Sequence, residues 1–283
     1  MNQHGDEYRV VFELPDKKYV SALGPDNKSD VQFVTVPNCD VHFGVNDTKL
    51  DCESSSELFL SCFVNGLGSN SPDQATLIGL THNFDATSAV NVYATQAETG
   101  SVYGIAYKST TKEIFSSAYI KQHASLTSHG HDAIFTTNLN GTPTTSLFVK
   151  LSDLGQQTGS LTESNSANCG YGAQVGQIGL GTMEMDEDER YLYVVNLFNN
   201  SVVKIDSDNP QVNTTQTFLI PNPSCSFNDF AVFAMKFYNN ELYVGVTCTA
   251  ETSKDLADRS FHVYKMNPVN GSLSLIFSTD YVK

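Results

Sequence analysis

Apolar and polar residues alternate with a period of two along most of the chain, which is the pattern of half-buried β-strands. The alternation is clear in short runs such as Tyr191–Val195 and Glu241–Val246, and polar turn residues separate each run from the next. A helical period is hard to find anywhere in the sequence. The pattern therefore predicts an all-β protein.

From residue 101 onward the strand pattern repeats three times, and each repeat has the order strand, turn, strand, loop, strand, turn, strand. The strands of the first repeat are expected at 103–107, 113–119, 133–137 and 145–149, those of the second at 181–185, 191–195, 201–205 and 215–220, and those of the third at 233–237, 241–246, 261–266 and 274–278. Equivalent apolar positions align in the first strands (Ile105, Met183 and Met235) and in the second strands (Phe115, Tyr193 and Tyr243).

Four-stranded antiparallel units in tandem are typical of β-propeller blades, and four to eight blades are needed to close a ring. Three units and one more expected strand at Ala75–Leu80 fall short of that number. The sequence therefore predicts an incomplete ring with an exposed edge. Further residues of a longer chain, or a second copy of this one, would cover that edge. A long β-sandwich is the alternative fold.

Three stretches, 100–107, 181–206 and 242–252, resemble the propeller segment of large bacterial surface proteins. In these proteins, propellers sit beside domains like the B repeats of staphylococcal Ser-Asp-repeat adhesins. The opening residues, Tyr8–Pro15 and 31–45, are similar to the closing strands of such a B-type sandwich. The resemblance implies a secreted, multi-domain surface protein with an adhesive or structural role, and it supplies no catalytic residue. Thr182 stands where the resemblance leads us to expect an acidic residue, which weakens a metal site there.

Three segments follow from the strand pattern and the resemblance. Residues 1–47 are expected to be the last strands of a B-type sandwich, about half of such a domain. Residues 48–72 carry two cysteines and a polar patch and are interpreted as a linker. Residues 73–283 are expected to be propeller blades.

The chain is acidic, with a net charge of −15 and 17% charged residues. Nucleic acids and anionic membranes require a basic surface, so neither is an expected partner. No apolar run is long enough to cross a bilayer. The start of the chain lacks the features of a secretory signal, yet the even number of cysteines and the Ser/Thr-rich composition favour an oxidising compartment. We therefore expect an extracellular or cell-surface protein, of which this sequence is a piece.

Six cysteines allow fifteen pairings. In a blade, the loop after the second strand lies on the same face as the connection from the preceding blade. Cys225 lies in such a connection and Cys248 ends a second strand, so these two are the favoured pair. Cys52 with Cys62 would close a local loop, which leaves Cys39 with Cys169. The alternative is that all six are reduced, and metal binding is disfavoured because no CxxC pair is present.

Candidate metal ligands fall into two groups, one of three histidines and one of oxygen ligands. His123, His129 and His131 lie in one polar loop and are the types of ligand that zinc or copper takes. Glu184 and Asn196 lie in the first two strands of the second repeat, where they would face a central channel. Calcium is the cofactor that the acidic composition suggests, with further candidate ligands Asp47, Asp51, Glu53, Asp206 and Asp208.

The acidic run Asp186–Glu189, which we call the acidic turn, is interpreted as a hairpin.

No nucleophile elbow, phosphate loop or zinc-protease motif is present. The leading hypothesis is a non-enzymatic structural or adhesion module that binds other extracellular domains or copies of itself, with assembly into a fibre or appendage as a variant. A calcium-dependent propeller hydrolase or lactonase using Glu184 and Asn196 is one alternative. A carbohydrate-binding module, suggested by 13 tyrosines, is another. Sequons for N-glycosylation, which matter in a eukaryotic secretory pathway, occur at Asn27, Asn46, Asn140, Asn199, Asn213 and Asn270.

Overall fold

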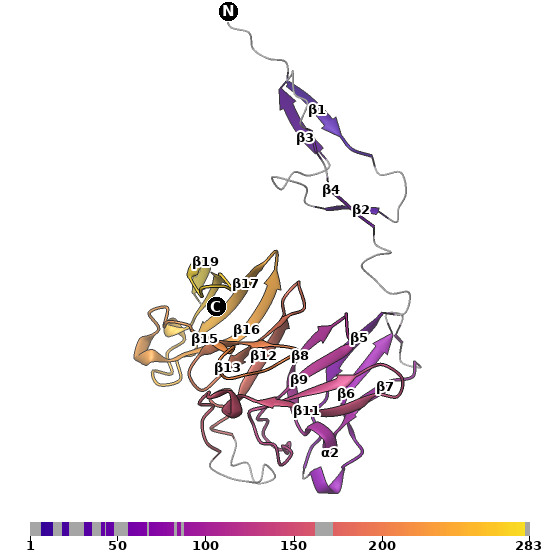
Figure 1. Ribbon diagram of the computed structural model, residues 1–283. Coiled ribbons are helices and arrows are strands. Elements are labelled where there is room, and N and C mark those ends of the chain that lie inside the picture. Colours follow the sequence, from indigo (N-terminus) through magenta and orange to yellow (C-terminus); the bar gives the residue numbers. More distant parts are fainter. Residues whose placement is uncertain are drawn as a thin grey trace, which may run out of the picture. The chain divides into compact units, whose positions relative to one another are not determined.

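The computed structural model describes residues 7–13, 19–22, 31–35, 41–42, 44–47, 56–66, 68–81, 84–85, 88–161 and 172–280. Contacts divide the chain into two units, one of residues 1–58 with 81–86 and one of residues 59–80 with 87–283. Nearly all regular structure is β-strand (Figure 1), which confirms the all-β prediction.

The first unit contains two antiparallel strand pairs. β1 (Glu7–Val11) pairs with β3 (Val31–Thr35), and β2 (Tyr19–Ala22) pairs with β4 (Gly44–Asp47). The stretches Tyr8–Pro15 and 31–45 include β3 and parts of β1 and β4, whereas β2 lies outside both. The assignment of residues 1–47 to a B-type sandwich stays a prediction.

Three four-stranded antiparallel sheets make up most of the second unit, and in each sheet the strands lie in chain order. Blade 1 contains β8 (Val102–Lys108), β9 (Glu113–Ala118), β10 (Ala133–Asn138) and β11 (Thr144–Lys150); blade 2 contains β12 (Leu180–Met185), β13 (Tyr191–Asn196), β14 (Ser201–Asp206) and β15 (Gln216–Leu219); blade 3 contains β16 (Phe230–Tyr238), β17 (Glu241–Cys248), β18 (Ser260–Met266) and β19 (Leu273–Asp280). Every strand of the predicted repeats is present. The first strands β8, β12 and β16 lie next to one another and form the inner edge of an arc.

The inner strands share a β-bulge at equivalent positions. The register against the second strand shifts between Val102 and Ile105 in β8, and it shifts at the same place in β12 and β16. A bulge adds a residue and increases the local twist. The three repeats therefore share this bulge as well as their strand order. The aligned apolar residues Ile105, Met183 and Met235 each come directly after the bulge.

Two apolar cores fill the spaces between the blades. Alternate residues of a strand point to opposite faces of its sheet, so each blade can contribute to two cores. Leu192 and Val194 of β13 pack into the core shared with blade 1, whereas Tyr193 and Val195 pack into the core shared with blade 3. β9 and β13, the second strands of blades 1 and 2, are almost wholly buried for this reason.

A further sheet of three strands, β5 (Glu57–Ser61), β6 (Ala75–Thr81) and β7 (Asn91–Thr95), packs against blade 1 through Leu77 and Ala94. β5 lies within the segment 48–72, and the interpretation of that segment as a linker is wrong for these residues. Its short apolar run Leu58–Leu60 is compatible with a strand, but the polar patch just before it obscured this signal. The remaining elements are helix α2 (Gln96–Thr99) and the short 3₁₀ turns η2 (Gly68–Asn70), η3 (Leu151–Leu154), η5 (Ser226–Asn228) and η6 (Leu256–Asp258).

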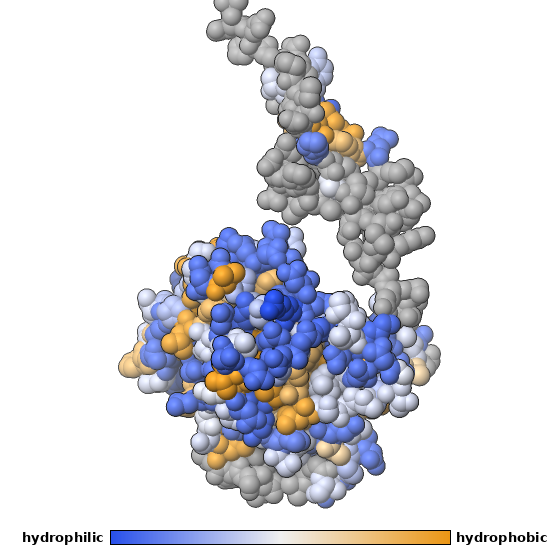
Figure 2. Space-filling view, viewed as in Figure 1, coloured by the Kyte–Doolittle hydropathy of each residue, from blue (hydrophilic) through white to orange (hydrophobic). Residues whose placement is uncertain are grey.

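Within the described ranges, no strand pairing joins blade 3 to the three-stranded sheet, so the blades form an arc. Figure 2 shows a mainly hydrophilic surface on this unit with separate hydrophobic patches. Among the helices described, none has the length and apolar character needed to cross a membrane.

Candidate functional site

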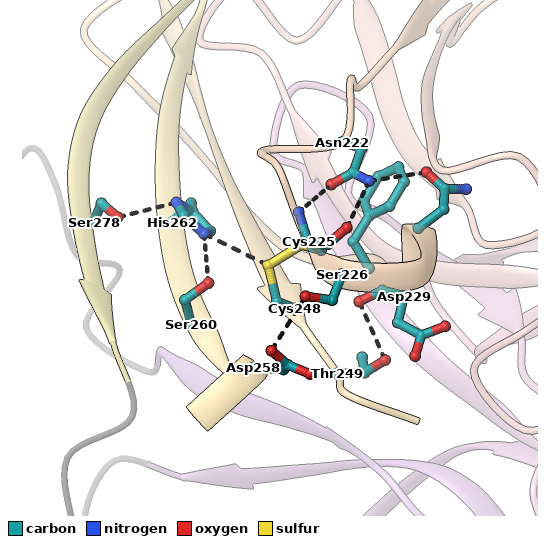
Figure 3. Close-up of a disulfide and its surroundings, with 12 residues drawn as sticks. Asn222, Cys225, Ser226, Asp229, Cys248, Thr249, Asp258, Ser260, His262 and Ser278 are labelled. Carbon is teal, nitrogen blue, oxygen red and sulfur yellow. Dashed lines mark hydrogen bonds between the residues drawn. A yellow bond between two sulfur atoms is a disulfide. The ribbon is translucent and has the colours of Figure 1, made fainter. Parts of the chain in front are cut away.

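A disulfide joins Cys225 and Cys248, the pair that the blade topology favours (Figure 3). Cys225 lies in the connection that enters blade 3, and Cys248 is the last residue of β17. Their Cα atoms are 5.3 Å apart, and both side chains are buried. The bond ties the connection between blades to the second strand of the blade that it enters.

Polar side chains fix both ends of this disulfide. The side-chain oxygen of Asn222 accepts a hydrogen bond of 2.6 Å from the backbone N–H of Cys225, and its amide donates to the Cys225 carbonyl over 3.2 Å. On the other side, the buried His262 lies with Nε2 3.7 Å from Cys248 Sγ and 2.8 Å from Ser260 Oγ, while Nδ1 lies 3.1 Å from Ser278 Oγ (Figure 3). This network connects β17, β18 and β19.

The other cysteines do not form a described pair. Cys62 carries a free thiol, which departs from the expected pairing with Cys52. Partial burial raises the pKa of the Cys62 thiol above its usual value, so the thiol is held in its unreactive protonated form. Cys39, Cys52 and Cys169 lie outside the described residues.

The three histidines of the predicted metal loop face different partners. The ring of His129 meets the ring of Phe135 edge to face at 5.9 Å. His131 Nε2 lies 3.2 Å from the carbonyl oxygen of Gly159, and the backbone carbonyl of His123 accepts from the N–H of Gly66. In the described part of the chain, no three His, Cys, Asp or Glu side chains are grouped to hold a metal ion.

Glu184 and Asn196 each have partners within the protein. Lys236 of β16 contacts both Glu184 carboxylate oxygens, at 2.9 and 3.2 Å. Asn196 is fully buried, and its amide donates to the Gln157 carbonyl over 2.8 Å. The two residues are therefore not brought together as a ligand pair. Glu184 and Lys236 occupy equivalent positions of neighbouring inner strands, and this opposite charge is the signal from which the pairing could have been found.

The oxygen ligands suggested after blade 2 also have partners. Asp206 Oδ1 accepts from the backbone N–H groups of Asp208 and Asn209, at 3.0 and 3.1 Å, and so closes a turn. The Asp208 carboxylate pairs with the buried Lys108 at the end of β8. This pair links blade 1 to blade 2. Asp51 and Glu53 lie outside the described residues, as does the side chain of Asp47.

The acidic turn is a hairpin, as the sequence analysis interprets it, and it also contacts both neighbouring blades. The Glu189 carboxylate accepts hydrogen bonds of 2.8 Å from the backbone N–H groups of Ser109 and Thr110, in the β8–β9 turn of blade 1. Glu187 accepts a hydrogen bond of 2.5 Å from the N–H of Asn239, in the β16–β17 turn of blade 3. One turn therefore holds three blades together, which its local sequence does not reveal.

These contacts alter the acidity of Glu189. Partial burial alone would raise the pKa of this carboxyl, but the hydrogen bonds from Ser109 and Thr110 outweigh it and lower the pKa to about 2. A carboxyl with a depressed pKa stabilises the folded state above its ordinary pKa of about 4.5, and this contribution is lost as the pH falls toward 2.

Glu189→Gln is expected to reduce the free energy of unfolding at pH 7 by up to about 1 kcal/mol. The effect is this small because the hydrogen bonds between the Glu189 carboxylate and the N–H groups of Ser109 and Thr110 are partly exposed to solvent. The difference from the wild type should shrink as the pH falls from about 5 to 2, because the wild-type carboxyl then becomes protonated. Urea unfolding at several pH values measures this difference. Asp188→Asn, in the same turn, is the matched control, and a difference independent of pH would contradict the assignment.

Four aromatic rings, Phe63, Tyr103, Tyr119 and Phe233, meet where the three-stranded sheet, blade 1 and blade 3 approach one another. We call them the inner aromatic cluster. The Tyr103 ring lies 5.2 Å from Tyr119 and 5.1 Å from Phe233, and the Phe63 ring lies 6.2 Å from Tyr119. Phe63 is 40% exposed and Tyr103 is 38% exposed. The sequence does not reveal this cluster, because its members are far apart in the chain.

The predicted sequons have a regular placement. Three of the asparagines lie in exposed turns between the third and fourth strands, one in each blade: Asn140, Asn213 and Asn270. Asn199 lies in the β13–β14 turn and is half-buried. Asn27 and the side chain of Asn46 lie outside the described residues.

Comparisons with known proteins give distant relatives. The chain is 26% identical to Colossin-B of Dictyostelium discoideum over 264 residues, covering 88% of this chain and 6% of that protein. It is 26% identical to Colossin-C of the same organism over 303 residues, covering 97% of this chain and 29% of that protein. The match to Colossin-D is 25% identical and covers 78% of this chain and 25% of that protein. The chain thus spans less than a third of the length of these relatives.

No protein-family model matches the chain. Among solved structures, the β-propeller domain of Myceliophteria thermophila Cps50 (Swd1) is similar with a TM-score of 0.36 and 8% identity, covering 81% of this chain and 74% of that one. A protein from Lactobacillus plantarum is similar with a TM-score of 0.39 and 10% identity, covering 72% of this chain and 51% of that one. These values are low, so the description of the fold as propeller blades rests on the sheet topology of this chain.

Proposed function

We propose that this chain is an extracellular structural module that assembles with copies of itself at the end of its propeller arc. The observation that carries the proposal is β19, the last strand of blade 3. Leu275, Ile276 and Phe277 are 53%, 51% and 53% exposed, and no described strand pairs with the outer edge of β19. A long apolar edge strand of this kind is a site at which other chains pair.

One further feature supports an extracellular role. The Cys225–Cys248 disulfide is the type of bond that persists in oxidising compartments. An apolar edge strand is also a liability at high protein concentration unless a partner covers it. An assembly role, in which β19 is covered, would remove this liability.

The experiment is sedimentation velocity of the full chain over a range of concentrations. We expect concentration-dependent association that Phe277→Glu weakens at least tenfold, because a carboxylate would have to be buried in the contact. Ser274→Glu is the matched control, since Ser274 lies on the same strand and pairs with Lys265. A wild-type chain that stays monomeric, or a Phe277→Glu variant that associates equally well, would overturn the assembly role.

N-glycosylation is proposed at the three sequons in the outer turns. The relatives come from a eukaryote, and exposed turns are accessible to the modifying enzymes. When the chain is secreted from a eukaryotic host, we expect glycans on Asn140, Asn213 and Asn270, which peptide mass spectrometry before and after enzymatic deglycosylation identifies. Asn199 is the internal control, because it lies in a half-buried turn whereas the other three asparagines are exposed. Unmodified outer turns would refute the assignment.

Carbohydrate binding is the second candidate function, and the inner aromatic cluster favours it. Partly exposed aromatic rings offer apolar faces on which a sugar ring can stack. Tyr103→Ala should abolish binding on a glycan array, whereas Tyr238→Ala, an exposed tyrosine elsewhere on blade 3, should leave it unchanged. If the wild-type chain binds no glycan, this second function is removed.

A further inference from the structure

One face of blade 2 packs against blade 3, and a small set of paired positions forms this face. Tyr193 of β13 lies opposite Lys204 of β14, and Val202 of β14 lies opposite Phe218 of β15. Alternate residues of a strand share a face of the sheet, so these four side chains lie on the same side of blade 2. Tyr193, Val202 and Phe218 belong to the core between blades 2 and 3.

These positions hold blade 3 in place through apolar and polar contacts. The Tyr193 ring lies 5.5 Å from the ring of Phe237 in β16, and the side chains of Tyr193 and Val202 are fully buried. Lys204 Nζ donates a hydrogen bond of 3.1 Å to the carbonyl of Pro268, in the β18–β19 turn. The Tyr–Lys and Val–Phe pairs of blade 2 are therefore the parts of its surface that receive the following blade.

Blade 3 has the same pairs at the equivalent register positions. Tyr243 of β17 lies opposite Lys265 of β18, and Val263 of β18 lies opposite Phe277 of β19. The neighbouring residue Val244 faces the core shared with blade 2, so these four side chains lie on the side that points away from blade 2. We call this side the outward face of blade 3, and its larger side chains are those of Glu241, Tyr243, Phe261, Val263, Lys265 and Phe277.

The outward face of blade 3 is exposed, unlike its counterpart on blade 2. Phe261 is 41% exposed and Phe277 is 53% exposed. Tyr243 is half-buried, whereas the equivalent Tyr193 is buried. The set of residues that receives a blade on blade 2 is therefore left in contact with solvent on blade 3.

The lysine of this set also has a different partner in blade 3. Lys204 reaches a backbone carbonyl of the following blade, whereas Lys265 pairs with Glu241 of its own face at 2.8 Å. Both groups of this ion pair remain partly exposed. An ion pair of this kind exchanges partners readily, because exposed pairs contribute little to stability.

The charge of the outward face favours a second copy of the chain as its partner. The chain carries a net charge of −15, which opposes contact between most surfaces of two copies. The six side chains of this face, in contrast, include one carboxylate and one ammonium group and are otherwise uncharged. In a two-fold symmetric contact the same patch meets itself, so Lys265 of each copy can meet Glu241 of the other while apolar residues meet apolar residues.

We propose that the outward face of blade 3 is a self-docking surface, on which the outward face of a second copy packs about a two-fold axis. This inference rests on the proposed assembly function and names the surface that makes the contact, which is the face of the sheet rather than the edge of β19. Phe277 belongs to both the face and the edge strand. Variants that alter the face without altering β19 therefore test the inference.

The first test uses two charge variants in sedimentation velocity. Glu241→Lys gives the face two lysines and Lys265→Glu gives it two glutamates, so each variant alone should associate about tenfold or more weakly than the wild type. An equimolar mixture should recover association to within about threefold of the wild type, because the two faces then carry opposite charges. Recovery in the mixture also shows that each variant is folded.

Asp153→Lys is the matched control, because it makes the same change of charge at an exposed residue of the η3 turn after blade 1. We expect it to associate like the wild type. A mixture of Glu241→Lys and Lys265→Glu that associates no better than either variant alone would overturn the two-fold contact.

The second test separates the face from the edge. Phe261 lies on β18, which is paired on both sides, so Phe261→Glu alters the face and leaves the edge of β19 intact. We expect association to weaken about tenfold or more, because a carboxylate would have to be buried in the contact. Leu219→Glu, at a 68% exposed residue of β15 in blade 2, is the control and should associate like the wild type.

The inference and the assembly function fail separately. If Phe277→Glu weakens association and Phe261→Glu does not, the edge of β19 makes the contact, which overturns the self-docking face and leaves the assembly role. A wild-type chain that stays monomeric overturns both. Ser274→Glu remains a suitable control for Phe277→Glu, because Lys265 lies opposite residue 274 and can pair with the added carboxylate.

Discussion

Replacing both Cys225 and Cys248 by alanine is expected to lower the free energy of unfolding by about 3 kcal/mol. The disulfide closes a loop with a sequence separation of 23 residues, and a cross-link of this span removes conformational freedom from the unfolded chain. The loop contains β16, the inner strand of blade 3, together with most of β17. Equilibrium unfolding in urea, with and without a reducing agent, measures the effect.

Cys62→Ala is the control for this prediction, because Cys62 is a free and only half-buried thiol. We expect it to change stability by less than about 1 kcal/mol, as for most partly exposed positions. Equal free energies of unfolding for the oxidised wild type and the double alanine variant would contradict the prediction. They would show that the disulfide does not stabilise blade 3.

Gly104→Val is expected to destabilise the fold by about 3 kcal/mol, at the upper end of the cost of overpacking. Gly104 lies where β8 and β12 approach most closely, and a Cβ atom there would lie 2.7 Å from the backbone oxygen of Gly181 and 2.7 Å from Ser117 Oγ. Ser117 also bridges the two strands, since it accepts from the Gly104 N–H over 3.1 Å and donates to the Gly181 carbonyl over 3.0 Å. A side chain at residue 104 would force the two inner strands apart.

Thr182→Val is the matched control, because it introduces the same side chain at a half-buried residue of β12, next to Gly181, without adding volume. Its effect should stay within about 0.5 kcal/mol. Urea unfolding again gives the values. A Gly104→Val variant as stable as the control would mean that the contact between blades 1 and 2 yields easily, and that the inner strands do not define the curvature of the arc.

The chain's alternation and internal repeat were sufficient for the strands of the three blades and for the favoured cysteine pair. Each blade is built from short hairpins, so its strands lie in chain order. The sequence repeat indicates that order because equivalent strand positions in the three blades have equivalent neighbouring strands. The Cys225–Cys248 pair could be predicted because blade topology alone places both residues on one face. β5 was missed because the polar residues that precede it share a short segment with it.

The roles of charged residues could not be predicted in this way. The sequence suggested a ligand role for Glu184, but Lys236 pairs with it across two inner strands. It predicted a hairpin for the acidic turn, but it did not show that Glu189 and Glu187 reach the turns of blades 1 and 3. These contacts depend on how neighbouring blades stack, and they join residues separated by 52 to 80 positions in the chain.

The sequence by itself therefore determined the strands, their hairpins and their grouping into blades, because each depends on local alternation and turn residues. Only the tertiary structure decided that β5, β6 and β7 form a sheet against blade 1 and that the acidic turn links three blades. Both depend on the direction and stacking of sheets, which arise when apolar faces from distant parts of the chain are buried together. The inner aromatic cluster belongs to the same class, since its four rings meet only after the blades have packed.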